Sequence, residues 1–112
     1  MTTMTHLLHR QCQTHDVAPM REPEIRSHLA EVPGWHTANG SIEKTFVFRN
    51  WLETLAFVNA LAWICHTEDH HPELAVAYDR CVVRFNTHAV NGVSINDFIC
   101  AAKANALVAF VA

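Results

Sequence analysis

The feature that most constrains the fold is a pair of β-hairpin patterns separated by one long helical pattern. In the first hairpin, residues 38–41 read Ala-Asn-Gly-Ser, and an Asn-Gly pair between strand-forming runs is a strong turn signal. In the second, Asp79-Arg80 makes a tight connection between two runs rich in β-forming residues. Each hairpin requires its own two strands to pair antiparallel. The predicted strands are residues 35–37, 42–48, 74–78 and 81–87.

Helical patterns before, between and after the hairpins complete the outline. A first helix begins near residue 22 and ends at Pro33-Gly34. Asn50 and Ser94 are each followed three residues later by an acidic residue, which resembles a capping box. They are expected to start a helix at 51–66 and the last helix of the chain. The order α-β-β-α-β-β-α predicts an α+β fold, with a four-stranded antiparallel sheet and helices packed on one face.

The predicted helix at 51–66 is apolar over much of its circumference. Trp51 and Leu55 follow one line along it, and Phe57 and Leu61 follow another. A helix of this kind is usually covered on more than one side. In a chain of 112 residues the second cover is expected to be another subunit.

Composition limits the chain to one compact domain and to a few classes of partner. Half of the 112 residues are hydrophobic and 17% are charged, an ordinary balance for a globular domain. Residues 1–20 lack periodicity and are predicted to be a flexible N-terminal extension, with the domain at 21–112. A formal charge of −3 predicts no direct nucleic-acid binding, and no apolar run approaches a membrane span. A cytoplasmic location is expected.

The four cysteines are expected to be reduced and mostly buried. Cys12, Cys65, Cys81 and Cys100 stand far apart, without the closely spaced pairs of a zinc ribbon or a redox motif. An unbridged cysteine packs as a small hydrophobic residue. The sequence therefore predicts thiols in the core and no disulfide framework.

Histidines between residues 66 and 88 offer chemistry near neutral pH. His66, His70 and His71 form one group, and His88 ends the last predicted strand, with Asp97 following. Imidazole titrates at about 6.5 and both accepts and donates protons. These histidines are interpreted as proton carriers, as metal ligands, or as cationic side chains at a helix end. Asp97 in turn has the alternative role of capping the last helix.

A metal site is the weaker alternative. If the middle helix continues to residue 70, His66 and His70 lie one turn apart, and His88 or Asp97 must supply a third ligand. The zinc-protease pattern, however, places glutamate directly after the first histidine, whereas Glu68 comes two positions later. We therefore predict no metal.

The spacing of these residues resembles the signature of the pterin-4a-carbinolamine dehydratase family. From Pro72 onward, the matching positions follow one another after six, ten and nine residues. The resemblance covers about residues 22–110. The matching residues are Pro33, Gly34 and Trp35 before the first hairpin, and then His70, His71, Pro72, Tyr78, His88 and Asp97.

This resemblance implies a dehydratase that converts 4a-hydroxytetrahydropterin into quinonoid dihydropterin and water by histidine acid/base catalysis, in tetrahydrobiopterin recycling. It implies no metal and no organic cofactor. The implied partners are the pterin substrate, a homodimer or homotetramer, and a functional link to an aromatic amino-acid hydroxylase. Groups that titrate near ambient pH suit the reaction, because it removes a ring proton and protonates the departing hydroxyl.

The resemblance also assigns roles to individual residues. His70 and His88 would be the principal acid/base pair, in either order, and His71 would orient the pterin and contribute to proton transfer. Asp97 and His66 would support these histidines. His66 stands where many members have glutamate, and Ala89 stands where an acidic residue is common. Substrate contacts are implied for Asp69, His70, His71, Asn86, Thr87, His88 and Ala89.

A binding role without catalysis is the alternative function. Some members of the family act as a transcriptional dimerisation cofactor or assist the assembly of another enzyme. This chain keeps His70, His71 and His88. The dehydratase is therefore the leading interpretation, and a non-catalytic binding module of the same fold is the second.

Overall fold

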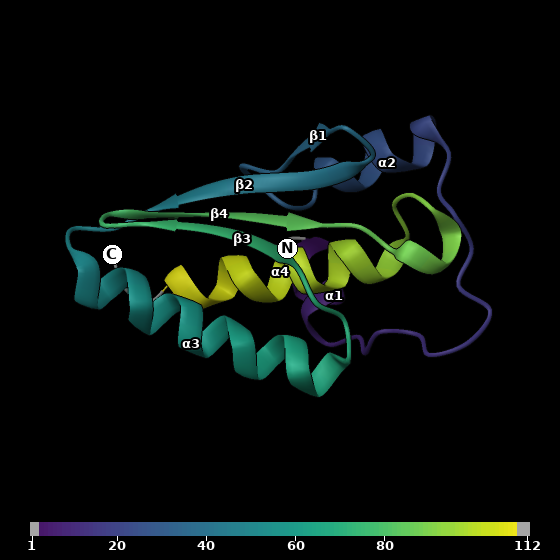
Figure 1. Ribbon diagram of the computed structural model, residues 1–112. Coiled ribbons are helices and arrows are strands. Elements are labelled where there is room, and N and C mark those ends of the chain that lie inside the picture. The colour runs from purple at the N-terminus through teal and green to yellow at the C-terminus, as the bar shows by residue number, and fades with distance from the viewer. Residues whose placement is uncertain (1–2, 110–112) are drawn as a thin grey trace.

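The computed structural model describes residues 3–109, and its elements follow the predicted order with two short additions (Figure 1). The additions are a helix near the N-terminus and a 3-10 turn after the last strand. Within the described residues no helix is long and apolar enough to cross a membrane. The elements are α1 (Thr3–Leu8), α2 (Glu22–Leu29), β1 (His36–Ala38), β2 (Ser41–Val47), α3 (Trp51–Glu68), β3 (Glu73–Ala77), β4 (Arg80–Phe85), η1 (His88–Val90) and α4 (Ile95–Val108).

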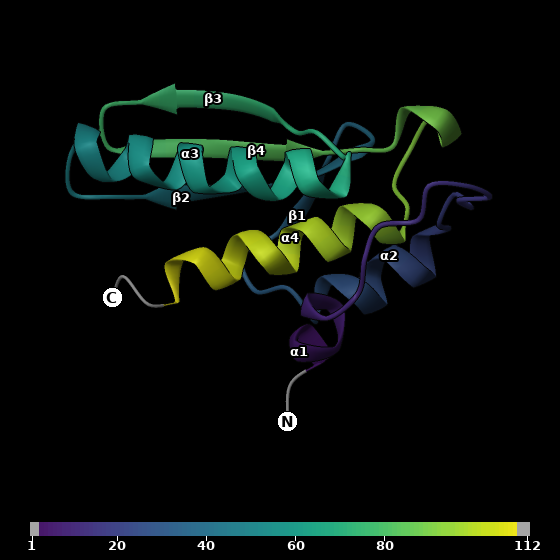
Figure 2. The same ribbon diagram turned by 90° about the horizontal axis from the view of Figure 1, so that it is seen from below.

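The four strands form one antiparallel sheet in the order β1-β2-β4-β3. The two central strands, β2 and β4, come from different hairpins and pair with Thr45 opposite Val82. α3 and α4 lie next to each other across one face of the sheet, as the two views in Figure 1 and Figure 2 show. The predicted α+β class, the four-stranded antiparallel sheet and the helices on one face are confirmed.

The core lies between this sheet and the two long helices. Alternation along β2 and β4 sends every second side chain toward the helices. Ile42 and Phe46 on β2, with Val83 and Phe85 on β4, are at most 3% exposed. The ring centre of Phe57 on α3 lies 4.6 Å from that of Phe46. This packing fixes the register, because a shift of one residue would turn the apolar side chains of a strand to the other face.

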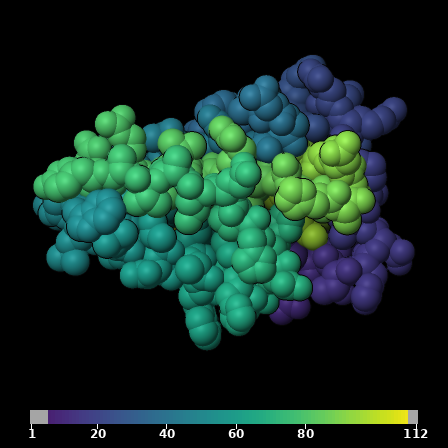
Figure 3. Space-filling view, viewed as in Figure 1, coloured from purple at the N-terminus to yellow at the C-terminus, as the bar shows by residue number. Residues whose placement is uncertain are grey.

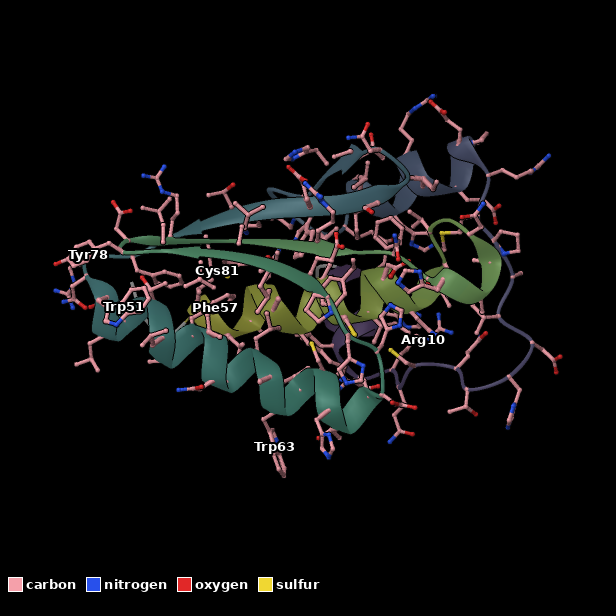
Figure 4. All side chains as sticks on the ribbon, in the orientation of Figure 1. Arg10, Trp51, Phe57, Trp63, Tyr78 and Cys81 are labelled. Carbon is pink, nitrogen blue, oxygen red and sulfur yellow. The ribbon has the colours of Figure 1, made fainter. Side chains whose placement is uncertain are left out.

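The outward side of α3 is apolar as well. Leu52 and Trp63 are 78% and 72% exposed, and Trp51 is about half exposed. Figure 4 shows Trp63 pointing away from the rest of the molecule. Large exposed apolar side chains gathered on one element are typical of an interaction surface. Association with another subunit through α3 stays a prediction.

Part of the predicted N-terminal extension packs on the domain. The sequence predicts that residues 1–20 are flexible, whereas α1 lies against α4 and its Leu7 is completely buried. The Nζ of Lys103 on α4 donates a hydrogen bond to the Leu8 carbonyl at 3.0 Å. One buried leucine and one backbone contact leave no periodic pattern in a sequence, so this packing is not predicted from it.

Residues 9–20, which we call the N-terminal strap, run as irregular chain past the start of α4. The side chain of Asn96 exchanges two hydrogen bonds with the backbone of Gln13, at 2.8 and 2.9 Å. The N–H of Met20 donates to the Val93 carbonyl at 2.8 Å. The strap is therefore tied to the chain both before and after the residue at which α4 begins.

The cysteines agree with the prediction of unbridged, mostly buried thiols. Cys65, Cys81 and Cys100 are buried, and Cys12 is partly exposed. Burial raises the pKa of the Cys65 thiol from 9.0 to about 12, with further contributions from Cys12 and Glu68. A thiol that resists ionisation only in the folded state makes stability depend on pH.

The free energy of unfolding should fall between pH 9 and about 12, because Cys65 ionises there in the unfolded chain and stays protonated in the folded one. One such thiol contributes a slope of about 1.4 kcal/mol per pH unit. Urea unfolding under reducing conditions across this range measures the slope. The Cys65→Ala variant should show a shallower slope, and an unchanged slope would contradict the assignment to Cys65.

Leu7→Ala should lower the free energy of unfolding by about 2–4 kcal/mol, because Leu7 is fully buried beside α4. Arg26→Ala is the control, since the Arg26 side chain is 75% exposed on α2, and it should change stability by less than about 0.5 kcal/mol. Chemical denaturation measures both variants. Equally small effects would mean that α1 does not unfold together with the domain.

Candidate active site

A cavity of about 440 Å³ opens at one end of the sheet, where α3 and β4 both end. Its walls come from the segment after α3 and from the last residues of β4 with the segment that follows. Figure 3 shows these green and lime segments next to each other on one side of the molecule. Every residue expected to contact substrate is among those that line it. The lining residues are Asp69, His70, His71, Pro72, Glu73, Arg84, Asn86, Thr87, His88 and Ala89.

The end of α3 delivers His70 to this cavity. α3 continues to Glu68, and Asp69 then takes a left-handed conformation with φ 53° and ψ 43°. Aspartate visits this conformation more readily than most residues, and here it ends the helix. The N–H of His70 donates to the Cys65 carbonyl at 3.1 Å. His70 therefore leaves the helix, whereas His66 stays on it, exposed and outside the cavity lining.

This helix end removes the geometry that a two-histidine metal platform requires. His66 and His70 would share one face only in a helix that continued to residue 70. Within residues 3–109, no three side chains of His, Cys, Asp or Glu are placed to hold a metal ion together. His66, for which a supporting role is expected, does not line the cavity, and that role stays a prediction.

Asp97 holds the ring of His70 from the protein side. Nε2 of His70 lies 2.6 Å from Oδ1 of Asp97, whose side chain is fully buried. The His70 ring also stacks on Phe85, with ring centres 5.8 Å apart and planes at 10°. Because a carboxylate only accepts hydrogen bonds, we assign the hydrogen of this contact to Nε2. Nδ1 is then the nitrogen of His70 that keeps a free lone pair.

The second oxygen of Asp97 is held as firmly as the first. Oδ2 accepts hydrogen bonds from the Oγ1–H of Thr87 and from the N–H of Ser94, both at 2.9 Å. The Ser94 hydroxyl lies 2.7 Å from Thr87 Oγ1 and accepts from the N–H of Asn96. Asp97 therefore caps α4 and also contacts a histidine, so the two roles that the sequence leaves open are compatible. Its burial leaves it little freedom to move away from His70.

A tight turn presents His88 at the opposite wall. Thr87 and Gly92 form an isolated antiparallel bridge, in which the N–H of Thr87 donates to the Gly92 carbonyl at 2.7 Å. η1 fills the turn between them, and Asn91 ends it in a left-handed conformation with φ 53°. His88 is the first residue of this turn and is exposed. The Thr87 side chain also donates a hydrogen bond to Asp97, which contacts His70. Thr87 therefore links the wall that carries His88 to the wall that carries His70.

Glu73 and Arg84 also line the cavity, and the sequence does not predict either of these charged residues there. Arg84 donates from Nε and Nη2 to Oε1 of Glu43 at 2.9 and 2.8 Å, and its Nη1 lies 3.7 Å from Oε1 of Glu73. The hydrogen bond from Arg84 is the main cause that lowers the pKa of Glu43. A signal for Arg84 is present in the sequence. Arg84 precedes Asn86 by two residues, and residues two apart in a strand point to the same side of the sheet.

The cavity presents three imidazoles in two different environments. His70 is braced by a buried carboxylate, whereas His71 and His88 are exposed to solvent. Imidazole exchanges protons near neutral pH. The arrangement can therefore take a proton from a bound molecule at one wall and deliver a proton at the other.

Comparison with known proteins identifies the family of this site. A match to the family described as Pterin 4 alpha carbinolamine dehydratase spans residues 18–107. A protein of Bdellovibrio bacteriovorus is 51% identical over 111 residues, which cover 96% of this chain and 92% of the relative. A protein of Stenotrophomonas maltophilia is 54% identical over 100 residues, which cover 88% and 84%. The names of both contain pterin-4-alpha-carbinolamine dehydratase.

A solved structure supports the same assignment. The crystal structure of a Brucella melitensis protein, described as a transcriptional coactivator/pterin dehydratase, matches with a TM-score of 0.78 at 32% identity. The match covers 80% of this chain and 98% of the other. The residues of the family match include every residue of the cavity and Asp97. The chain therefore belongs to the pterin 4 alpha carbinolamine dehydratase family.

Proposed function

We propose that this chain catalyses the loss of water from 4a-hydroxytetrahydropterin, which gives quinonoid dihydropterin in tetrahydrobiopterin recycling. The observation that carries the proposal is the 2.6 Å contact between His70 and Asp97 in a cavity that His71 and His88 also line. The cavity volume of about 440 Å³ is in the range of small-molecule sites. Family membership indicates the substrate, and the cavity offers the groups that its dehydration requires.

His70 is proposed as the general base. Its Nε2–H is committed to Asp97, so the lone pair of Nδ1 accepts the proton from a pterin ring nitrogen. The negative charge of Asp97 stabilises the imidazolium that this transfer creates, as in other pairs of carboxylate and histidine. Stacking on Phe85 keeps the ring in one orientation during the transfer.

His88 is proposed as the general acid. It would protonate the 4a hydroxyl as the bond from C4a to oxygen breaks, so that the hydroxyl leaves as water. Because His88 is exposed, it can regain its proton from solvent, and His70 can release the proton that it has taken. His71, next to His70 in the chain and exposed, would orient the pterin and contribute to proton transfer.

The remaining cavity residues are proposed to bind the edge of the pterin. A pterin ring carries donors and acceptors side by side, and amide, hydroxyl, carboxylate and backbone groups pair with such an edge. Asp69 comes from the wall that carries His70, and Asn86, Thr87 and Ala89 come from the wall that carries His88. A flat substrate held between these walls would place both proposed proton carriers against it.

The wider setting of the reaction is part of the same proposal. The family implies a homodimer or homotetramer, a link to an aromatic amino-acid hydroxylase, and catalysis without an organic cofactor. A cytoplasmic location fits the recycling of a soluble pterin. Sedimentation of the purified protein would establish the number of subunits.

A non-catalytic binding module is the second candidate. The related Brucella melitensis protein is described as a transcriptional coactivator as well as a pterin dehydratase. The exposed apolar side chains of α3, among them Leu52 and Trp63, would suit a protein partner. Measured catalysis separates the two candidates, because a module of this kind needs no proton chemistry.

His70→Ala and His88→Ala should each lower kcat of the dehydration by at least about tenfold, since each removes one acid/base group. A phenylalanine hydroxylase assay measures how far the protein accelerates quinonoid dihydropterin formation above the spontaneous rate. His15→Ala is the matched control, because His15 is an exposed histidine of the N-terminal strap, and it should keep the wild-type rate. If the wild-type protein gave no acceleration, the dehydratase proposal would fail and the binding module would replace it.

Asp97→Asn should lower kcat by at least about tenfold and destabilise the fold by about 1–3 kcal/mol. The amide carries no charge to stabilise imidazolium, and it turns one acceptor oxygen into a donor among buried donors. Asp79→Asn is the matched control, since Asp79 lies at the β3–β4 turn and its side chain is exposed. Turnover and urea unfolding measure the two effects. A folded Asp97→Asn protein with wild-type kcat would leave Asp97 with a capping role alone.

A further inference from the structure

Two thiols from opposite ends of the sequence meet beside α4. Sγ of Cys12 lies 3.6 Å from Sγ of Cys100. Cys12 belongs to the N-terminal strap and is partly exposed, whereas Cys100 lies on α4 and is completely buried. Within residues 3–109 no group of three potential metal ligands includes this pair.

The backbone around Cys12 is held in place without any bond between the sulfurs. The N–H of Cys12 donates to Oε1 of Glu68 at 2.7 Å, and the N–H of Gln13 donates to Oδ1 of Asn96 at 2.8 Å. These bonds fix the strap to the end of α3 and to the first turn of α4. Sulfur atoms in a disulfide are about 2.05 Å apart, so closing the gap requires a movement of about 1.5 Å. Rotation about a cysteine Cα–Cβ bond moves the sulfur through distances of this order.

We propose that Cys12 and Cys100 form an oxidisable pair, which a low-molecular-weight disulfide such as glutathione disulfide converts into a bond between the strap and α4. Nothing in the proposed dehydration uses these two residues, so the inference is independent of that function. The bond would close a loop from residue 12 to residue 100. It would convert a hydrogen-bonded attachment of the strap into a covalent one.

The order of attack follows from access. Cys12 reaches solvent, and its thiolate would attack one sulfur of glutathione disulfide, forming a mixed disulfide and releasing one glutathione thiolate. Cys100 would then give its proton to that thiolate, attack Sγ of Cys12 and release the second glutathione as a thiolate, which takes up the proton that Cys12 lost to solvent. Two protein thiols and one glutathione disulfide thus become one protein disulfide and two glutathione molecules. The hydrogen bond with Cys12, together with burial, raises the pKa of Cys100, so Cys100 stays protonated while Cys12 attacks first.

The experiment treats the full chain with graded ratios of oxidised to reduced glutathione at about pH 8, followed by alkylation, peptide mapping and thermal unfolding. We expect the free thiols to fall from four to two, with one disulfide that joins Cys12 to Cys100. The melting temperature should rise by about 10 °C, since a disulfide across a long loop restricts the unfolded chain. Adding a reductant should reverse both changes.

Matched variants make the outcome decisive. Cys81→Ala, a buried cysteine of β4, should still form the bond, whereas Cys12→Ser should abolish both the bond and the rise in melting temperature. Cys100→Ala should abolish them too, and Cys12→Ser keeps the test valid if that buried substitution prevents folding. Three results would overturn the proposal: glutathione retained on Cys12 without an internal bond, a bond from Cys12 to Cys65, or four free thiols in excess oxidant.

Discussion

The buried carboxylate of Asp97 is the group on which the rest of the site depends. It is fully buried and accepts hydrogen bonds from His70, Thr87 and Ser94. A buried charge with several donors is stable where it is, but loss of any one donor leaves it poorly solvated. The three donors come from the segment after α3, the end of β4 and the start of α4. One carboxylate thus joins the elements whose ends meet at the cavity.

The sheet topology explains why those ends meet. β2 and β4 pair in the centre although they belong to different hairpins, and α3 connects the first hairpin to the second. α3 runs back along the sheet, so its last turn lies at the end of the sheet at which β4 finishes. The left-handed turn at Asp69 then directs His70 toward that end. A rigid core of Phe46, Phe57 and Phe85 supports an open, polar rim.

The sequence predicts the structural features that depend on local patterns. It does not predict the features that depend on single contacts between residues far apart in the chain. The Asn-Gly turn at residues 39–40 and the capping pattern of Ser94 predict the hairpin and the start of α4, and the structure has both. The fold predicted from these patterns agrees with the structure in class and order. The cavity contains every residue expected to bind substrate, whereas His66 lies on α3 outside the cavity lining. Packing of Leu7 and the position of Arg84 depend on partners distant in sequence, which no periodicity records.

Because of the N-terminal strap, the packed domain begins earlier in the chain than the family-model match does. The match to the family model begins at residue 18, but the strap already touches the domain at Cys12 and Gln13. A protein shortened to the matched region would retain every cavity residue, yet it would open the side chains of Glu68 and Asn96 to water. Those side chains lie directly beside the segments that carry His70 and Asp97. The region that the family model matches is therefore shorter than the region that packs as one domain.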